Sequence, residues 1–224
     1  VESHVAPAAP PEAELQTGLV FGIGGRWCRI GAPLGTGSFG VVWAAECAGV
    51  GEVAIKEIVC QTETELARAS YEAQLLHALS VGSGAVPRIP TYVSSETSQL
   101  PSGARRMRLA MTRLPGVPLD RFLHEHQLRM GACSEPRIRC RQVTYAFQFA
   151  HALVAQLAPT ISCVAGHAYH RDINAHNILI DAEESRLEYG LVDFGLAVDA
   201  ARWMDPSTNN PGGCGEWEFL DVGG

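Results

Sequence analysis

Polar side chains in the last third of the sequence have types and spacing suited to chemistry on a metal-bound phosphate. Asp172 and Asn177 lie close together in the stretch His170–Ile180, and an apolar run follows them. An aspartate can accept the proton of a hydroxyl or orient that hydroxyl, and an asparagine oxygen is a good ligand for Mg²⁺. Asp193 follows a second apolar segment and precedes a Phe-Gly pair, which predicts a metal-binding corner at a strand end.

A glycine-rich stretch lies between two segments that look like strands. Gly35, Gly37 and Gly40 would let the backbone approach a polyphosphate, so that its N–H groups face the phosphate oxygens without obstruction by side chains. A tight hairpin uses the same residues, so the pattern alone is not specific. A dinucleotide-binding turn would continue into a helix, whereas Val41–Ala44 continues as a strand, which argues against that site.

Lys56 interrupts the apolar strand candidate Glu52–Cys60. A buried ammonium is costly unless it has anionic partners, such as phosphates and a carboxylate. The helix expected at Thr62–Leu79 carries Glu65 and Glu72 on roughly the same face. We expect Glu72 to be the partner, because Glu65 is engaged in a capping box at the helix start. The alternative is a solvated lysine on an edge strand.

The elements that must position these residues divide the chain into a strand-rich half and a helix-rich half, which indicates an α+β fold in two lobes. We expect a mobile leader over residues 1–25, an N-lobe over 26–113 and a partial C-lobe over 114–224. Periodicity and turn residues predict the following strands and helices. The strands are Arg29–Leu34, Val41–Cys47, Glu52–Cys60, Thr91–Ser95 and Arg106–Thr112, and the helices are Thr62–Leu79, Leu119–Gln127 and Gln142–Leu157.

Composition restricts the class of protein. With 224 residues, 46% hydrophobic and 18% charged, the chain is globular rather than disordered or coiled-coil. Its net charge of −7 argues against a nucleic-acid-coating protein, and its apolar stretches are broken short of a membrane span. The seven cysteines form no C-x-x-C pair and no signal peptide is visible, so we expect reduced thiols in an intracellular, cytoplasmic protein. Zinc at Cys163, His167 and His170 is the alternative, but a fourth ligand has no obvious source.

In their order along the chain, the motifs resemble those of a eukaryotic protein kinase domain. The glycine loop, V-A-I-K at Val53–Lys56, H-R-D-x-x-x-x-N at His170–Asn177 and D-F-G at Asp193–Gly195 span roughly residues 27–198. The resemblance implies a bilobal kinase-like fold that uses ATP and Mg²⁺. It also implies transfer of the γ-phosphoryl group to a protein hydroxyl. From the charge and the short apolar stretches, we expect no nucleic-acid or membrane partner.

The resemblance assigns roles to matching positions. Lys56 would hold the phosphates and pair with Glu72, Asp172 would be the catalytic aspartate, and Asn177 and Asp193 would hold Mg²⁺. Leu76, His170 and Phe194 would belong to the stacked residues of the assembled state. The remaining nucleotide-binding positions would be Gly35, Gly37, Phe39 and Gly40 over the phosphates, Val42, Ala54 and Leu179 around the adenine, Met111 as gatekeeper and Leu114 in the hinge.

Some positions depart from the family pattern. Asn174 stands where serine/threonine kinases carry lysine, and His176 stands where tyrosine kinases carry arginine. We expect serine/threonine specificity. No A-P-E motif or later C-lobe helix follows the D-F-G, so we expect a C-lobe that breaks off in its activation segment. The alternatives are an ATP-binding pseudokinase or scaffold without transfer activity, and a small-molecule phosphotransferase of the kinase-like fold.

Overall fold

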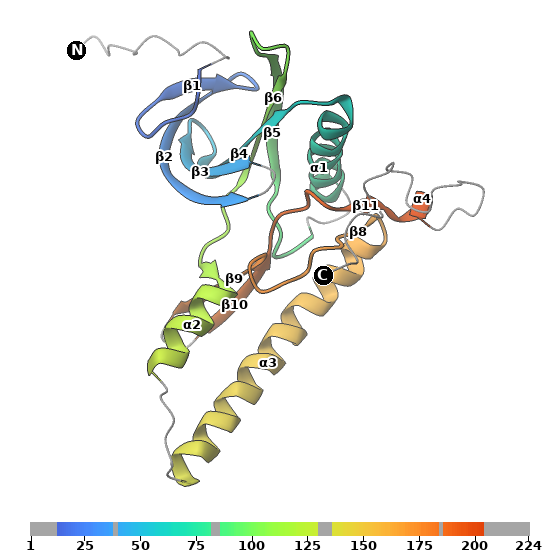
Figure 1. The fold of residues 1–224 in the computed structure, drawn as a ribbon. Coiled ribbons are helices and arrows are strands. Elements are labelled where there is room, and N and C mark those ends of the chain that lie inside the picture. Colours follow the sequence, from blue (N-terminus) through green and yellow to red (C-terminus); the bar gives the residue numbers. More distant parts are fainter. Residues whose placement is uncertain (1–12, 38–39, 82–85, 130–135, 184–185, 204–224) are drawn as a thin grey trace. The chain divides into compact units, whose positions relative to one another are not determined.

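The chain forms two compact units (Figure 1). The computed structural model describes residues 13–37, 40–81, 86–129, 136–183 and 186–203. The first unit contains Val1–Ala85 and Pro90–Arg113, and the second contains Val86–Ile89 and Leu114–Gly224. The chain therefore leaves the first unit for the last time after Arg113, which is also where the boundary between the lobes is predicted.

The first unit is built on a six-stranded antiparallel sheet of order β1-β2-β3-β4-β6-β5. Each predicted strand is present, and no strand end differs from its predicted position by more than four residues. One strand, β1, was not predicted. The bounds are β1 Val20–Ile23, β2 Arg26–Gly37, β3 Gly40–Cys47, β4 Gly51–Cys60, β5 Tyr92–Gln99 and β6 Arg105–Thr112.

Within the predicted leader, Val20–Ile23 forms a strand of this sheet and Leu15 packs into its core, so a mobile leader through residue 25 is wrong for these residues. Val20 pairs with Arg29 of β2, and Phe21 and Ile23 are buried. Glycines on both sides of this short strand hide its alternating pattern in the sequence. Its side chains enter a core cluster made of Leu15, Phe21, Ile23, Cys28, Ile30, Ala45, Cys47, Val53, Ile55 and Ala110.

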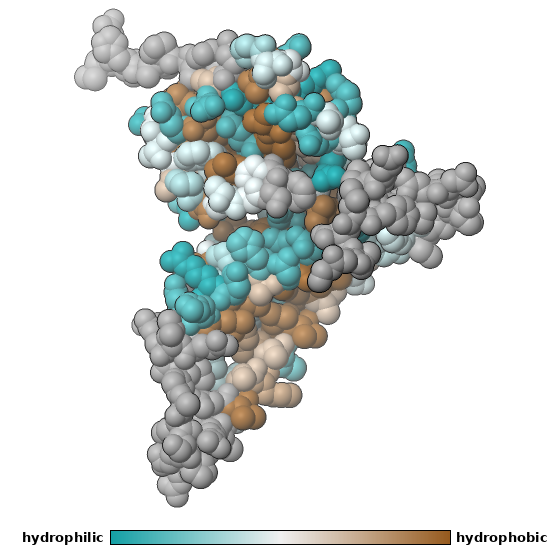
Figure 2. Space-filling view, viewed as in Figure 1, coloured by the Kyte–Doolittle hydropathy of each residue, from teal (hydrophilic) through white to brown (hydrophobic). Residues whose placement is uncertain are grey.

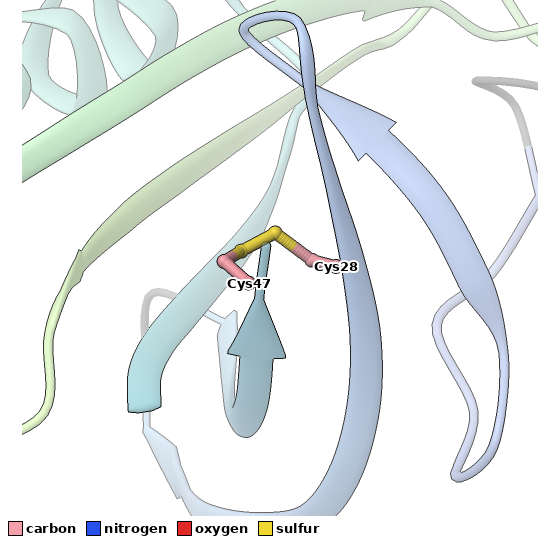
Figure 3. Close-up of a disulfide and its surroundings, with 2 residues drawn as sticks. All are labelled: Cys28 and Cys47. Carbon is pink, nitrogen blue, oxygen red and sulfur yellow. A yellow bond between two sulfur atoms is a disulfide. The ribbon is translucent and has the colours of Figure 1, made fainter. Parts of the chain in front are cut away.

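A disulfide joins Cys28 of β2 to Cys47 of β3 (Figure 3). The two residues are directly opposite each other in the antiparallel register, with their Cα atoms 4.1 Å apart, and both are buried. The expectation of reduced thiols is therefore wrong for this pair. The structure also describes two free cysteines, the buried Cys60 and the exposed Cys163. The other three cysteines lie outside the residues whose side chains are described.

One helix of the first unit, α1, covers residues Glu63–Val81. It begins with the predicted capping box: the Glu65 N–H donates to Thr62 Oγ1 at 3.2 Å, and the Thr62 N–H donates to Glu65 Oε2 at 3.2 Å. Its buried face contains Ala69, Ala73 and Leu76, together with Glu72. The helix therefore directs a carboxylate into the unit along an otherwise apolar face.

The second unit contains small sheets and the remaining described helices. Strand β10 (Arg186–Leu191) pairs with β9 (Ile178–Glu183), which pairs with β7 (Val117–Pro118). The two-residue strands β8 (Ala168–Tyr169) and β11 (Val198–Asp199) pair with each other. The helices are α2 (Leu119–Arg129), α3 (Pro136–Ala165) and α4 (Ala200–Trp203).

Helix α3 is longer than the predicted segment Gln142–Leu157, and it continues through Pro159. Proline usually ends a helix because it lacks an N–H donor, but tertiary contacts fix this one. The Gln156 amide donates to Leu187 O at 2.7 Å and accepts from the Tyr189 N–H at 3.1 Å, which ties α3 to β10. On the next turn, Thr160 Oγ1 donates to Pro87 O at 3.0 Å.

Much of the outer surface of α3 is apolar, as Figure 2 shows. Val143, Phe147 and Val154 are each at least 60% exposed. Within the described residues, Val143–Ala165 is long and apolar enough to cross a membrane by length and composition, contrary to the expectation that every apolar stretch is too short. A helix of a soluble domain can have the same length and composition as a membrane-spanning helix.

Candidate active site

The described glycines of the glycine-rich stretch lie at the end of β2 and at the start of β3, where Gly37 pairs with Gly40. Gly40 has a φ of +135°, and a Cβ there would collide with the backbone carbonyl of Glu57 on β4. Among the described residues, a Cβ at Gly35 or Gly37 would instead meet no atom within 4 Å. Gly40 is therefore required by the fold, whereas the open space beside Gly35 and Gly37 suits a close approach by phosphate. Phe39 lies outside the described residues.

The predicted nucleotide-binding side chains of the first unit share one face of the sheet. Val42 of β3 is opposite Lys56 of β4, and Met111 of β6 is opposite Ala54. Side chains alternate along a strand and opposed residues share a face, so all four project to the same side. Met111 and Ala54 are buried and Val42 is partly exposed, which makes a largely apolar wall beside the Lys56 ammonium.

The predicted ion pair between Lys56 and Glu72 is confirmed. Lys56 Nζ donates to both carboxylate oxygens of Glu72, at 2.9 Å and 2.8 Å, and the two side chains are only 4% and 2% exposed. Glu65, the competitor, remains in its capping box. Lys56 is also the only lysine among the 224 residues. Because both members of the ion pair are buried, the pair holds the Lys56 ammonium beside the side chains of Val42, Ala54 and Met111.

In the second unit, the loop between β8 and β9 carries the predicted catalytic aspartate. Asn174 Nδ2 donates to Asp172 Oδ1 at 2.7 Å, and Asn177 Nδ2 donates to Asp172 Oδ2 at 2.7 Å. The carboxylate is therefore held from both oxygens by neutral amides. Because the Asn177 amide nitrogen is used in this way, its oxygen is the atom suited to bind a cation.

His170 joins this loop to the segment that carries Asp193. Its Nε2 donates to Val192 O at 3.2 Å, its Nδ1 accepts from the Asp172 N–H at 3.3 Å, and its ring lies 4.7 Å from that of Phe194. This pattern requires a neutral ring protonated at Nε2. Burial lowers the pKa of His170, opposed by its bond to Val192 O and by the charges of Asp193 and Asp172. His170 and Phe194, two of the three residues expected in the stacked set, are in ring contact at an interplanar angle of 55°.

Asp193 lies beside this loop with an unusual backbone conformation. Its φ is +61°, and its Oδ1 accepts from the Gly195 N–H at 3.2 Å. The neighbouring Val192 N–H donates to Asn177 O at 2.9 Å, which brings the two predicted metal ligands onto adjoining backbone. No group of three His, Cys, Asp or Glu in the described part of the chain is placed to hold a metal. A single carboxylate and an amide oxygen still fit Mg²⁺, which takes its other ligands from water and substrate phosphates.

Leu179 and Leu114, the two other predicted nucleotide-binding residues of this unit, lie outside the loop between β8 and β9. Leu179 of β9 is opposite Gly190 of β10 and is partly exposed. Leu114 packs on Gly190, where an added Cβ would lie 2.7 Å from Leu114 Cδ1. Both leucines therefore lie about the same residue of β10, which has no side chain to separate them.

Two contacts near the loop were not predicted. His176 Nδ1 lies 3.3 Å from Asp120 Oδ2 at the start of α2, and the Arg171 guanidinium lies 5.6 Å from the centre of the Trp203 ring. A hydrogen bond from the Arg121 backbone, together with contact with His176, lowers the pKa of Asp120. The position of Asp120 in the first turn of a predicted helix is the one signal in the sequence that marks it.

The motifs of both units fall within a single match to a protein-family model. The family model described as protein tyrosine and serine/threonine kinase matches residues 28–213. A search of curated proteins found no match. The match covers most of the chain and includes each of the motifs described above. The chain therefore belongs to the protein tyrosine and serine/threonine kinase family.

Proposed function

We propose that this chain is an active protein kinase that transfers the γ-phosphoryl group of Mg-ATP to a serine or threonine hydroxyl of a protein. The observation that carries the proposal is the buried pair of Lys56 and Glu72. Burying two charges gives little net stability, because desolvation offsets their attraction. A chain that keeps its only lysine in this arrangement uses it for something other than folding, and binding of phosphate is the use that the kinase family implies.

In this proposal the first unit holds the nucleotide. Lys56 offsets the charge of the α- and β-phosphates, and the open space beside Gly35 and Gly37 admits the polyphosphate to the backbone N–H groups. Mg²⁺, bound by Asn177 and Asp193, would neutralise the charge that develops on the phosphate oxygens. The wall formed by Val42, Ala54 and Met111 takes the adenine.

The second unit supplies the group that faces the acceptor. The acceptor hydroxyl oxygen forms a bond to the γ-phosphorus while the bond from that phosphorus to the β–γ bridging oxygen breaks, and ADP leaves. Asp172 receives the hydroxyl proton. The amides of Asn174 and Asn177 fix the orientation of the two Asp172 carboxylate oxygens. Positioning of the reacting groups, rather than covalent chemistry, then lowers the barrier.

A preference for serine and threonine is supported by the surroundings of His176. An acceptor site of the tyrosine class would call for a cation at this position, and the His176 ring instead lies against Asp120. The Asp120 carboxylate would pair with a positive charge on that ring and offset it, so the charge would be less available to a substrate. Phosphoamino-acid analysis of a labelled mixed protein substrate tests this directly, because label on tyrosine alone would contradict the preference.

The alternative is a nucleotide-binding pseudokinase. Two measurements on the full chain separate the two functions. The first follows modification of Lys56 by an amine-reactive ATP analogue, read by intact mass. Because the chain has one lysine, one side-chain adduct that excess ATP suppresses reports nucleotide binding.

The second measurement is transfer of labelled γ-phosphate to a generic protein substrate, with Asp172→Asn as the matched control. Transfer by the wild-type chain and not by the variant supports the kinase. Protection of Lys56 without any transfer identifies the pseudokinase, and neither protection nor transfer contradicts both functions.

A further inference from the structure

The side chain of Asn174 connects the backbone of the catalytic loop to the carboxylate of Asp172. Its Oδ1 accepts hydrogen bonds from the backbone N–H groups of His176 and Asn177, at 2.8 Å and 3.2 Å. Its Nδ2 donates to Asp172 Oδ1 at 2.7 Å. Both ends of one amide are therefore in use, one for the loop and the other for the predicted catalytic group.

These contacts fix which way the amide points. If the amide were turned over, its NH₂ group would face two N–H donors and its oxygen would face a carboxylate, and both contacts would be repulsive. The backbone of His176 and Asn177 thus determines that a donor faces Asp172. Any movement of this loop backbone would be transmitted to the Asp172 carboxylate through Asn174.

Asn177 acts on the other carboxylate oxygen in a similar way, with Nδ2 2.7 Å from Asp172 Oδ2 and 3.0 Å from Asp172 O. Asn177 is buried, while Asn174 is exposed. With only one amide in place, the carboxylate could turn about its terminal torsion, which is broad for aspartate. Two donors on different oxygens restrict that rotation.

We propose that Asn174 is a positioning residue for phosphoryl transfer: it holds the Asp172 carboxylate in the orientation that accepts the proton of the acceptor hydroxyl. This inference rests on the proposed kinase function and goes beyond it, since Asn174 touches neither substrate in this role. Because the amide is neutral, Asn174 places no full positive charge beside the Asp172 carboxylate.

The isosteric variant Asn174→Asp separates this role from simple stabilisation of the loop. An aspartate at this position can still accept the two backbone hydrogen bonds, but its second oxygen would face the Asp172 carboxylate and repel it. Asn174→Ala removes both functions. If Asn174 positions Asp172, both variants lower kcat by roughly 10- to 100-fold, the range for loss of a hydrogen bond to a charged group, with the KM for ATP unchanged within about twofold.

The pH profile supplies a readout that a loop-capping role would not move. In Asn174→Asp, two facing carboxylates favour a shared proton, which raises the pKa of one of them. The protonated oxygen can then donate to Asp172 as the amide does. We therefore expect the ratio of variant to wild-type kcat to rise as the pH falls from 8 to 6, and the ratio for Asn174→Ala to stay constant.

The outcomes are distinct. Asn174→Asp with wild-type kcat and a flat pH ratio would overturn the positioning role and leave the kinase function intact. Wild-type rates in both variants would do the same. A wild-type chain that protects Lys56 with ATP but transfers no phosphate would overturn the kinase function, and the positioning role with it. Melting temperatures of the variants show whether a lost rate reflects lost folding.

Discussion

Lys56 and Glu72, sixteen residues apart in the sequence, meet in a two-point contact in which one ammonium donates to both oxygens of one carboxylate. Strand β4 supplies the lysine and helix α1 supplies the glutamate. The contact couples the position of α1 to the position of the Lys56 ammonium, so a shift of one displaces the other. A change at either residue should therefore affect both folding and nucleotide binding.

Glu72→Gln removes the negative charge that faces Lys56. We expect the free energy of unfolding to fall by about 3–5 kcal/mol, as for other buried pairs that lose one member, and transfer activity to fall with it. The matched control is Glu65→Gln on the same helix, where glutamine serves a capping box nearly as well and the change should stay below about 0.5 kcal/mol. Chemical denaturation measures both.

The double variant Lys56→Met/Glu72→Leu tests whether the unpaired charge of Lys56 causes the loss of stability in Glu72→Gln. It removes both charges, so most of the lost stability should return while nucleotide protection and transfer remain absent. A double variant as unstable as Glu72→Gln would show that packing of α1, and not the unpaired charge, sets the loss.

Alanine substitutions at Gly37 and Gly40 should have different effects on stability and on ATP binding. Gly37→Ala adds a methyl group to open space, so stability should change by less than about 0.5 kcal/mol while the KM for ATP rises. Gly40→Ala places a Cβ against the Glu57 carbonyl at a φ of +135°, and we expect a loss of about 1–3 kcal/mol. Thermal melts and ATP titrations of the two variants give the comparison, and equal loss of stability in both would contradict it.

His170 should make stability depend on pH. Burial lowers its pKa in the folded state below the ordinary value of 6.5, so just below pH 6.5 the unfolded chain binds a proton that the folded chain does not. Stability from this group is therefore present above about pH 6.5 and is lost as the pH falls toward the folded-state pKa.

The variant His170→Gln should show a shallower fall in melting temperature between pH 7.5 and 5.5 than the wild-type chain. His167→Gln is the control, since His167 is exposed and its substitution should leave the pH slope unchanged. An unaltered slope in His170→Gln would assign the acid sensitivity to other groups.

The disulfide between Cys28 and Cys47 should stabilise the first unit. Its sequence separation of 19 residues corresponds to about 3 kcal/mol in the chain-entropy treatment. The melting temperature should fall when the wild-type chain is unfolded and refolded with reductant. Reductant should not shift the melting temperature of Cys28→Ser/Cys47→Ser, whereas Cys163→Ser should respond to it as the wild type does. A wild-type melt that is insensitive to reductant would contradict the bond.

The parts of the site that depend on local sequence were predictable. Helical periodicity put Glu65 and Glu72 on roughly the same face, and the capping box at Glu65 left Glu72 as the expected partner, which the structure confirms. The apolar run after Asn177 indicated a strand, and β9 begins at the next residue, Ile178. These signals operate within a turn or two of chain, and neighbouring residues carry all the information.

The features that sequence reasoning missed depend on contacts between distant segments. The disulfide follows from a strand register in which bulges near Pro33 shift the pairing, and seven cysteines with no motif give no indication of it. Helix α3 runs through Pro159 because Gln156 and Thr160 bond to other segments. The intracellular location, the nucleotide contacts and the acceptor specificity stay predictions.

The disulfide also makes the glycine-rich turn part of a closed covalent ring, because both strands that lead to the turn are joined at their far ends. A protease that cuts once inside this ring opens it without releasing a fragment. Nicked protein would therefore run as one chain on a gel without reductant and as two pieces with it. Intact mass under non-reducing conditions would differ from the uncut value by a single water, so a preparation cut in its glycine-rich segment could pass for an undamaged one.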